Sequence, residues 1–416
     1  MIKIQRNIAL KNIEKLYSEL HSTKGSKVDL LLPLDIDSKD FSVIPALIQF
    51  VGTWRRHPNC GKLFTKTNIN EVETISEFIY TEIGFASVVL AWENGIYDKN
   101  LVDIKQQLKP YNEEIHAKMK TLSNVVGNSL LLTCFDHIPK EKGLLNCFYP
   151  NNKDFISNEE QLNFFIDRGL KLVLRSLGNK SKDTLISKIF MDIRDIVYEL
   201  LKNTHEWART DEQNTILNPN LRGIYLKFHR STIDSYRNNY KDLPQLDNYF
   251  KHDFVVNTNN EAYFLEVSVF DTGPGFVKRN LHLFGGDFEK LSFTEQVSIV
   301  KFCLSKNGTG EQSYKSTFKG KGLDRILHLL DNKGFLRVRT NNLSLFRDLK
   351  SDPYQENVSV KNYIDIQIQS FQNDEMKDKF QYADGALVSI VYPIDFTLFQ
   401  EVPPAADLLF KIDPII

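Results

Sequence analysis

The sequence has no excess of either charge, since 52 Lys and Arg residues balance 53 Asp and Glu residues in a chain of 416. Without a basic excess, it gives no broad electrostatic reason to expect nucleic acid or an anionic membrane as a partner. Long apolar runs are also missing: segments such as 129–134 are far too short to span a bilayer, and the N-terminus lacks the apolar core of a signal peptide. We therefore expect a soluble cytoplasmic protein with no membrane partner.

Cysteine is scarce and scattered. The four residues form no Cys-x-x-Cys pair; they are Cys60, Cys134, Cys147 and Cys303. This distribution argues against a zinc site and is typical of reduced thiols. Repeats and low-complexity tracts are absent too, and the length leaves room for two or three domains, each with its own core.

One stretch joins an apolar strand to a turn that suits a small polar ligand. The run 267–270 is apolar and rich in β-branched residues, and it delivers a single carboxylate, Asp271, to the strand end. Gly273 and Gly275 then let the backbone turn sharply beside it. Alone, Asp-x-Gly-x-Gly more often marks an ordinary turn, so its meaning depends on what accompanies it.

Two further blocks flank this turn in the sequence. Upstream, residues 182–209 predict an amphipathic helix in which Glu199 and Asn203 lie four apart on one face, a spacing that suits a general base and a metal ligand. Downstream, the run from Lys319 to Leu323 places lysines and glycines just before an apolar helix, where free backbone N–H groups attract phosphate. Near the end, residues 384–393 alternate like a strand and stop at a proline.

In this order the four blocks resemble the nucleotide-binding domain of the GHKL superfamily, which contains gyrase, Hsp90, histidine kinases and MutL. The matching residues are Glu199 and Asn203 for the N box, Asp271, Gly273 and Gly275 for the first glycine box, Gly320 and Gly322 for the second, and Gly385 for the terminal Gly-Thr strand. The resemblance covers residues 155–395. It implies a Bergerat-type two-layer α/β sandwich, with a mixed sheet and helices on one face.

The resemblance also implies ATP and Mg²⁺ as ligands, with a role for each block. Asp271 would accept a charge-assisted hydrogen bond from the adenine amino group. Asn203 would coordinate Mg²⁺, and Glu199 would orient or deprotonate the attacking water. The triphosphate would be held by Lys319, Lys321 and the N–H groups of Gly320, Gly322 and Leu323.

One residue departs from the family pattern. Where the family has Gly-Thr on its last strand, this chain has Gly385 and Ala386, so the hydroxyl that helps to hold adenine is missing. We expect either a reduced affinity for ATP or replacement of this hydroxyl by Ser389 or a water, and a less secure specificity for adenine than Asp271 alone implies.

The remaining sequence predicts an N-terminal α/β domain of unknown role at residues 1–150, the nucleotide-binding domain at 155–395 and a C-terminal tail at 396–416. Helices are expected at 3–22 and 41–54 and a buried strand at 28–34, while 85–92 is either a strand or a core helix. The charged run 54–58 is expected to be a solvated face, and His116 an ordinary histidine rather than a phosphoacceptor. The polar stretch 231–260 is expected to be a surface insertion.

These features predict an ATP-binding protein, a Mg²⁺-dependent ATPase whose nucleotide state changes its interaction with an unidentified protein partner. Two alternatives stay open: a protein kinase of the anti-sigma or histidine-kinase-like type, and a non-hydrolysing nucleotide-binding scaffold. Neither a phosphoacceptor box before the domain nor a transducer domain after it is found, which favours a stand-alone ATPase domain. The superfamily often dimerises, so a homodimer is allowed, although no residue here indicates one.

Overall fold

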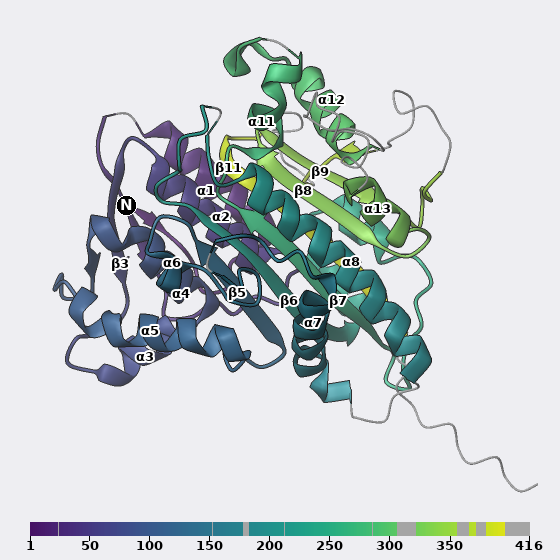
Figure 1. Ribbon diagram of the computed structural model, residues 1–416, viewed down its shortest axis with the longest axis horizontal. Helices are drawn as coiled ribbons and strands as arrows, with labels where there is room; N and C mark the ends of the chain where they lie inside the picture. The colour runs from purple at the N-terminus through teal and green to yellow at the C-terminus, as the bar shows by residue number, and fades with distance from the viewer. Residues whose placement is uncertain are drawn as a thin grey trace, which may run out of the picture.

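The computed structural model describes residues 1–23, 25–151, 153–177, 183–211, 213–284, 286–305, 322–355, 366–371 and 380–395. Two β-sheets organise this part of the chain (Figure 1). The smaller is parallel, in the order β1-β2-β3-β4, and the larger is antiparallel, in the order β10-β9-β8-β11-β7-β6-β5. The α/β class is therefore confirmed, whereas the expected mixed sheet is wrong, since every described pairing in the larger sheet is antiparallel.

The strands of the smaller sheet all come from the first hundred residues: β1 (Ile2–Lys3), β2 (Val28–Leu32), β3 (Cys60–Thr65) and β4 (Ile96–Tyr97). The larger sheet draws strands from most of the remaining chain: β5 (Ser129–Phe135), β6 (Leu221–Thr232), β7 (Glu261–Asp271), β8 (Phe335–Asn341), β9 (Leu343–Asp348), β10 (Gln367–Ile368) and β11 (Ala383–Ile394).

The helices of the first 150 residues are α1 (Leu10–Ser22), α2 (Val43–Arg56), α3 (Val72–Ile79), α4 (Glu82–Ala91), α5 (Lys105–Thr121) and α6 (Lys140–Gly143). Those that follow are α7 (Glu159–Val173), α8 (Asp183–Trp207), α9 (Ile233–Tyr240), α10 (Pro244–Tyr249), α11 (Gly275–Phe284), α12 (Phe293–Leu304) and α13 (Gly322–Leu329). Short 3-10 turns occur at Trp92–Asn94, Arg175–Leu177 and Phe288–Lys290.

The sheet boundary does not follow the expected domain boundary at residue 150. β5 lies before that boundary, yet all seven of its residues pair with β6, from Ser129 opposite Lys227 to Phe135 opposite Leu221. The buried apolar residues of both halves also form one continuous core. Residues 1–150 and 155–395 therefore share a sheet and a core, which turn-rich composition near residue 150 could not reveal.

One face of the larger sheet is covered by α7 and α8 (Figure 1). The predicted apolar stripe of α8 is buried throughout, from Ile193, Ile196 and Val197 to Leu200 and Leu201. It meets the alternate aliphatic residues of the central strands, which include Ile224, Leu226 and Val267. Apolar burial thus holds α8 on this face, together with one buried hydrogen bond from the Tyr392 hydroxyl of β11 to Asp192 at 2.7 Å.

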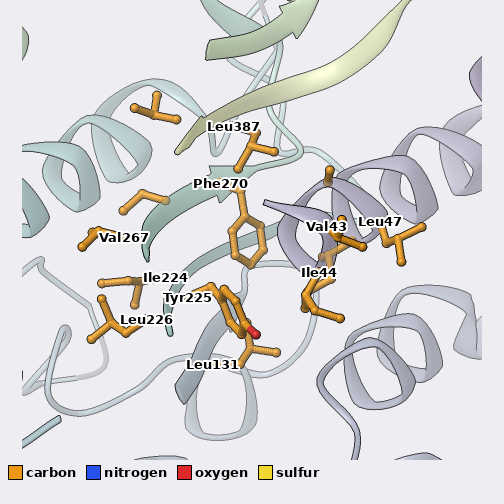
Figure 2. Close-up of a cluster of buried hydrophobic side chains, with 14 of the residues drawn as sticks. Val43, Ile44, Leu47, Leu131, Ile224, Tyr225, Leu226, Val267, Phe270 and Leu387 are labelled. Atoms are coloured by element: carbon orange, nitrogen blue, oxygen red, sulfur yellow. The ribbon is translucent and has the colours of Figure 1, made fainter. Parts of the chain in front are cut away.

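The opposite face is covered by the N-terminal helices, which corrects the expectation of helices on one face only. α2 packs on β11 and β7. Figure 2 shows Phe270 and Tyr225 pointing toward α2, near Val43 and Ile44, while Ile224 and Leu226 point the other way. The seven-stranded sheet is therefore buried between two helical layers.

Buried polar side chains join the N-terminal helices to this second face. Arg339 of β8, which is 1% exposed, donates from Nε and Nη2 to the two carboxylate oxygens of Glu14 on α1, at 2.9 and 3.0 Å. On β7, Glu266 accepts from the Ser42 backbone N–H at 3.0 Å and lies 2.9 Å from His229 Nε2. The docking of residues 1–56 onto the sheet thus depends on directional bonds as well as on apolar contact.

Two other segments can be compared with what the sequence predicted for them. Residues 85–92 are helical rather than extended, because most of them belong to α4. The stretch 231–260 contains α9 and α10 and buries Tyr236, Tyr240, Tyr249 and Phe250 in an aromatic cluster with Phe41, so it is not simply a surface insertion. Its tyrosines read as polar by composition but pack through their rings.

The charged run 54–58 is not a solvated face. Arg55 donates to the Leu90 carbonyl and pairs with Glu93, while Arg56 donates to the Pro219 carbonyl, so both guanidinium groups bind protein atoms. Their side chains are 17% and 13% exposed. His116, by contrast, is a buried residue of α5, as expected.

Among the described residues, no single helix has the length and apolar composition needed to cross a bilayer; α3 taken together with 82–94 meets that test, but the two segments bend by 93° where they join.

Candidate functional site

Asp271 ends β7 and is 7% exposed. Its Oδ1 accepts hydrogen bonds from the backbone N–H of Gly273 at 2.8 Å and of Ala386 at 3.3 Å. Burial raises the pKa of this carboxyl to about 6, against the opposing effect of those two N–H groups and of Arg222. A carboxylate in this position is incompletely compensated by the protein, which is the condition for a strong interaction with a ligand donor.

The three glycines of the predicted boxes, Gly273, Gly275 and Gly385, lie where other protein atoms approach too closely to leave room for a Cβ atom. A Cβ on Gly273 would lie 2.6 Å from Ala208 Cα, just beyond the end of α8. Gly275 has φ +78°, and a Cβ there would lie 2.6 Å from Thr340 Oγ1. Gly385 has φ +73°, and its Cβ would lie 1.9 Å from the carbonyl oxygen of Asp271. Close packing around Asp271 therefore requires glycine at all three positions.

Two polar residues at the end of β8 hold the first turn of α11. Thr340 Oγ1 accepts from the Phe276 N–H at 3.0 Å and donates to the Gly385 carbonyl at 2.9 Å. Asn341 accepts from the Val277 N–H at 3.0 Å and donates to the Pro274 carbonyl at 2.8 Å. They join the glycine turn to β11. Sequence reasoning missed both residues, because only the sheet order brings β8 beside this turn.

A second polar group lies behind the Asp271 turn. Asn220 donates to Asp136 at 3.1 Å and to the Ala208 carbonyl at 3.0 Å, and it accepts from the Thr272 hydroxyl at 3.1 Å. Arg222, opposite Asp271 on β6, forms two 2.7 Å bonds with Asp136. This group was also missed; Arg222, a charged residue just before the apolar run 224–226, was the signal for it.

Glu199 and Asn203 are half-buried on α8, and Ala208 marks the point where this helix reaches the Asp271 turn. At 1.5 Å per residue, Asn203 lies about 7 Å and Glu199 about 13 Å before Ala208 along the helix axis. The distance from the Asp271 turn, measured along the axis of α8, therefore increases from Asn203 to Glu199.

The Glu199 end of this row along α8 meets α13. Arg325, in the first turn of α13, forms an ion pair with Asp195, one turn before Glu199. Burial raises the pKa of Glu199, while Lys202 and Arg325 oppose that rise. Gly322 begins α13 and Leu323 is buried, whereas Lys319, Gly320 and Lys321 lie outside the described residues.

Two neighbours of the site have structural contacts. His205 Nδ1 lies 3.0 Å from the Tyr149 hydroxyl, and its ring stacks on Phe155, in agreement with a packing role. Ser389 does not replace the missing threonine hydroxyl, because its Oγ lies 2.8 Å from Ser268 Oγ on the face turned away from Asp271. That expectation was wrong, since residues 386 and 389 point to opposite faces of a strand.

No group of three or more His, Cys, Asp or Glu side chains within the described ranges could hold a metal ion by itself. A Mg²⁺ ion bound with a triphosphate needs only one or two protein oxygens, so the amide oxygen of Asn203 fits that use.

No family model, no curated protein and no solved structure matches this chain.

Proposed function

We propose that this chain binds ATP with Mg²⁺ in a GHKL-type site of the Bergerat kind and hydrolyses it. The observation that carries the proposal is the row along α8: buried Asp271 at one end, then Asn203, then Glu199 beside the first turn of α13. An extended nucleoside triphosphate has the same order of parts, with a base that donates hydrogen bonds at one end and phosphates at the other.

The base end is defined by Asp271. Its Oδ1 is already oriented by two backbone N–H groups, so the carboxylate does not have to reorganise to accept the adenine amino group. Glycine at positions 273, 275 and 385 lets the neighbouring backbone and side chains pack closely around Asp271, which fixes the position of this acceptor. A buried acceptor that is fixed in this way fits a purine.

At the phosphate end, the free N–H groups at the N-terminus of α13 attract anions, and Asn203 offers one oxygen to a cation. Bound ATP supplies the phosphoryl group, and Mg²⁺ supplies charge that balances the phosphate oxygens. Glu199 is half-buried, and burial raises its pKa, so its carboxylate is tuned toward accepting a proton from water.

A contact between the two halves supports a nucleotide-dependent switch. On β11, the Asp384 N–H donates to Thr53 Oγ1 at 2.9 Å, and the Asp384 carbonyl accepts from Gln49 Nε2 at 3.1 Å. Both partners lie on α2, and Asp384 immediately precedes Gly385, which touches Asp271. A change at the nucleotide would therefore reach the N-terminal layer, which we propose as the surface that a protein partner senses.

The test is ATP titration by calorimetry with Mg²⁺ present, followed by tracing of γ-labelled phosphate. Asp271→Asn is expected to weaken ATP binding by about tenfold to a hundredfold, because one charge-assisted hydrogen bond is lost. The same change is expected to reduce the preference for ATP over GTP, because an asparagine can also donate to the guanine carbonyl.

Glu199→Gln is expected to keep ATP binding and to lower release of free phosphate by about 10²- to 10⁴-fold, the range of a general base. Glu160→Gln, at an exposed position in the first turn of α7, is the matched control and should change neither ATP binding nor the release of free phosphate. Label that remains on the protein or passes to a partner would replace the ATPase by the kinase alternative. ATP binding without any release or transfer of phosphate would leave the non-hydrolysing scaffold, and absence of any ATP heat would overturn the proposal.

A further inference from the structure

A second cavity, of about 560 Å³, lies away from Asp271, between α4, α5 and the turn that follows β5. Its size falls within the range of small-molecule sites. It is lined by aromatic and aliphatic side chains that include Phe85, Val89, Trp92, Phe135 and Ile138. Flat apolar walls of this kind favour a flat apolar ligand.

Two residues that line this cavity each have one polar atom without a hydrogen-bond partner among the described residues. These atoms are Oδ1 of Asn112 and Nε2 of His116, both on α5 and both enclosed by protein in the unliganded chain, so a ligand meets them only when these side chains turn toward the cavity. His116 as a whole is 8% exposed. Since the two residues are four apart, they lie on one face of α5. Buried polar atoms without partners are costly, so an unmade pair on one wall indicates a missing ligand edge.

The histidine is neutral in this setting. Burial, with a further contribution from Lys120, lowers the pKa of His116 to about 4. A neutral imidazole has one nitrogen that accepts and one that donates, whereas Asn112 Oδ1 only accepts. The wall therefore matches a ligand edge that carries a hydrogen-bond donor, with a second polar atom about one helical turn away.

Charge around the rim selects the sign of the ligand. The lining has four cationic side chains, Arg55, Lys109, Lys120 and Lys142, and two anionic ones, Glu93 and Glu113. Arg55 pairs with Glu93 at 3.1 Å and Lys142 with Glu113 at 3.0 Å. Lys109 and Lys120 are left as the excess charge, which favours an anion.

We propose that this cavity is a second ligand-binding site, which takes a flat aromatic anion whose polar edge meets Asn112 and His116 and whose acidic group lies near Lys109 and Lys120. The site is independent of ATP hydrolysis, because none of its lining residues belongs to the row along α8.

The test uses 1-anilinonaphthalene-8-sulfonate, an aromatic anion with an N–H donor, titrated by its fluorescence against the full chain without nucleotide. Saturable binding of one probe per chain is expected, with energy transfer from tryptophan that falls in Trp92→Phe, because Trp92 lines the cavity and is one of three tryptophans in the chain. Ala117→Trp, at an exposed position on the cavity side of α5, is expected to raise the dissociation constant at least about tenfold by filling the cavity. Gln107→Trp, on another face of the same helix, is the matched control and should bind as the wild type does.

A second variant tests the charges of the two lysines separately from the shape of the cavity. The double change Lys109→Gln and Lys120→Gln is expected to weaken the probe by about threefold to tenfold and to remove most of the salt dependence of its binding. Circular dichroism and thermal melting of each variant establish that it folds. Equal binding by Ala117→Trp and Gln107→Trp, or no saturable binding by the folded wild type, would overturn the proposal.

Discussion

The two faces of the seven-stranded sheet differ in how much of their contact with the covering helices is polar. α8 covers one face with an aliphatic stripe that meets Ile224, Leu226 and Val267. The N-terminal layer covers the other with apolar contacts and with buried polar pairs such as Glu14 with Arg339. Apolar contact is tolerant of small shifts, whereas a bidentate ion pair fixes one position. The difference teaches that the helix bearing Glu199 is held mainly by shape, with one buried bond in which Asp192 accepts from the Tyr392 hydroxyl of β11 at 2.7 Å, while the N-terminal layer is held in a defined register by a bidentate ion pair.

Arg339 shows how completely one polar position is specified. Besides the two bonds to Glu14, Nη1 donates to the carbonyls of Asn341 at 2.6 Å and Leu343 at 3.2 Å, and Nη2 donates to that of Gln381 at 2.6 Å. Neighbouring Arg337 lies 3.7 Å from the same Glu14 carboxylate. One buried carboxylate therefore serves two guanidinium groups.

The largest expected effect comes from removing that shared carboxylate. Glu14→Leu leaves Arg339 and Arg337 buried without an anion, which is expected to cost about 3–5 kcal/mol of unfolding free energy. Urea denaturation measures it. Glu19→Leu, at an exposed position of α1, is the control. A loss below about 1 kcal/mol would mean that the polar face is not what positions the N-terminal layer.

Conservative replacements sharpen the comparison. On the apolar face, Ile193→Leu keeps volume and is expected to cost less than about 1.5 kcal/mol. On the polar face, Arg339→Lys loses the guanidinium fork and is expected to cost about 2–4 kcal/mol, since several carbonyl groups lose their donors. Parallel urea curves compare the two; equal costs would remove the distinction between the faces.

The last prediction concerns Asp271, where a substitution is expected to raise the free energy of unfolding rather than to lower it. Its pKa of about 6 exceeds the model-peptide value of 3.8, so its contribution to stability is present below pH 4 and is lost as the pH rises through 6. Asp271→Asn keeps an oxygen for Gly273 and Ala386 and removes the buried charge. We expect the unliganded variant to be about 1–3 kcal/mol more stable at pH 7 and nearly unchanged at pH 4. Thermal melting at both values measures this, and an equal difference at the two would contradict it.

Local sequence patterns predicted single helices and strands better than they predicted which helices and strands pack or pair with one another. The 3.6-residue period placed α8, and a β-branched run with glycines placed β7 and its turn, because both signals depend on neighbours in sequence. Glu14 and Arg339 are 325 residues apart, so no local pattern connects them. For the same reason the sequence separated β5 from the sheet that it joins.

The residues of the candidate site also fall into two groups, those that a local motif predicted and those that it did not. Asp271 and its glycines were singled out by a short motif, and the structure brings Gly385 against them. Asn220, Thr340 and Asn341 were missed, since each acts through a strand end that only the sheet order brings near. Motifs identify the residues that face a ligand more readily than those that hold them in place.

The position of β11 has a consequence for how the protein is made. It lies between β7 and β8 in the sheet, yet it follows every other described strand along the chain. Until residue 394 has left the ribosome, the facing edges of β7 and β8 stay unpaired, and exposed strand edges invite aggregation. A chain cut before Ala383 keeps both edges open and lacks the Ala386 N–H that orients Asp271. The candidate site is therefore completed only when β11 has been synthesised, and we expect a chain cut before Ala383 to fold incompletely.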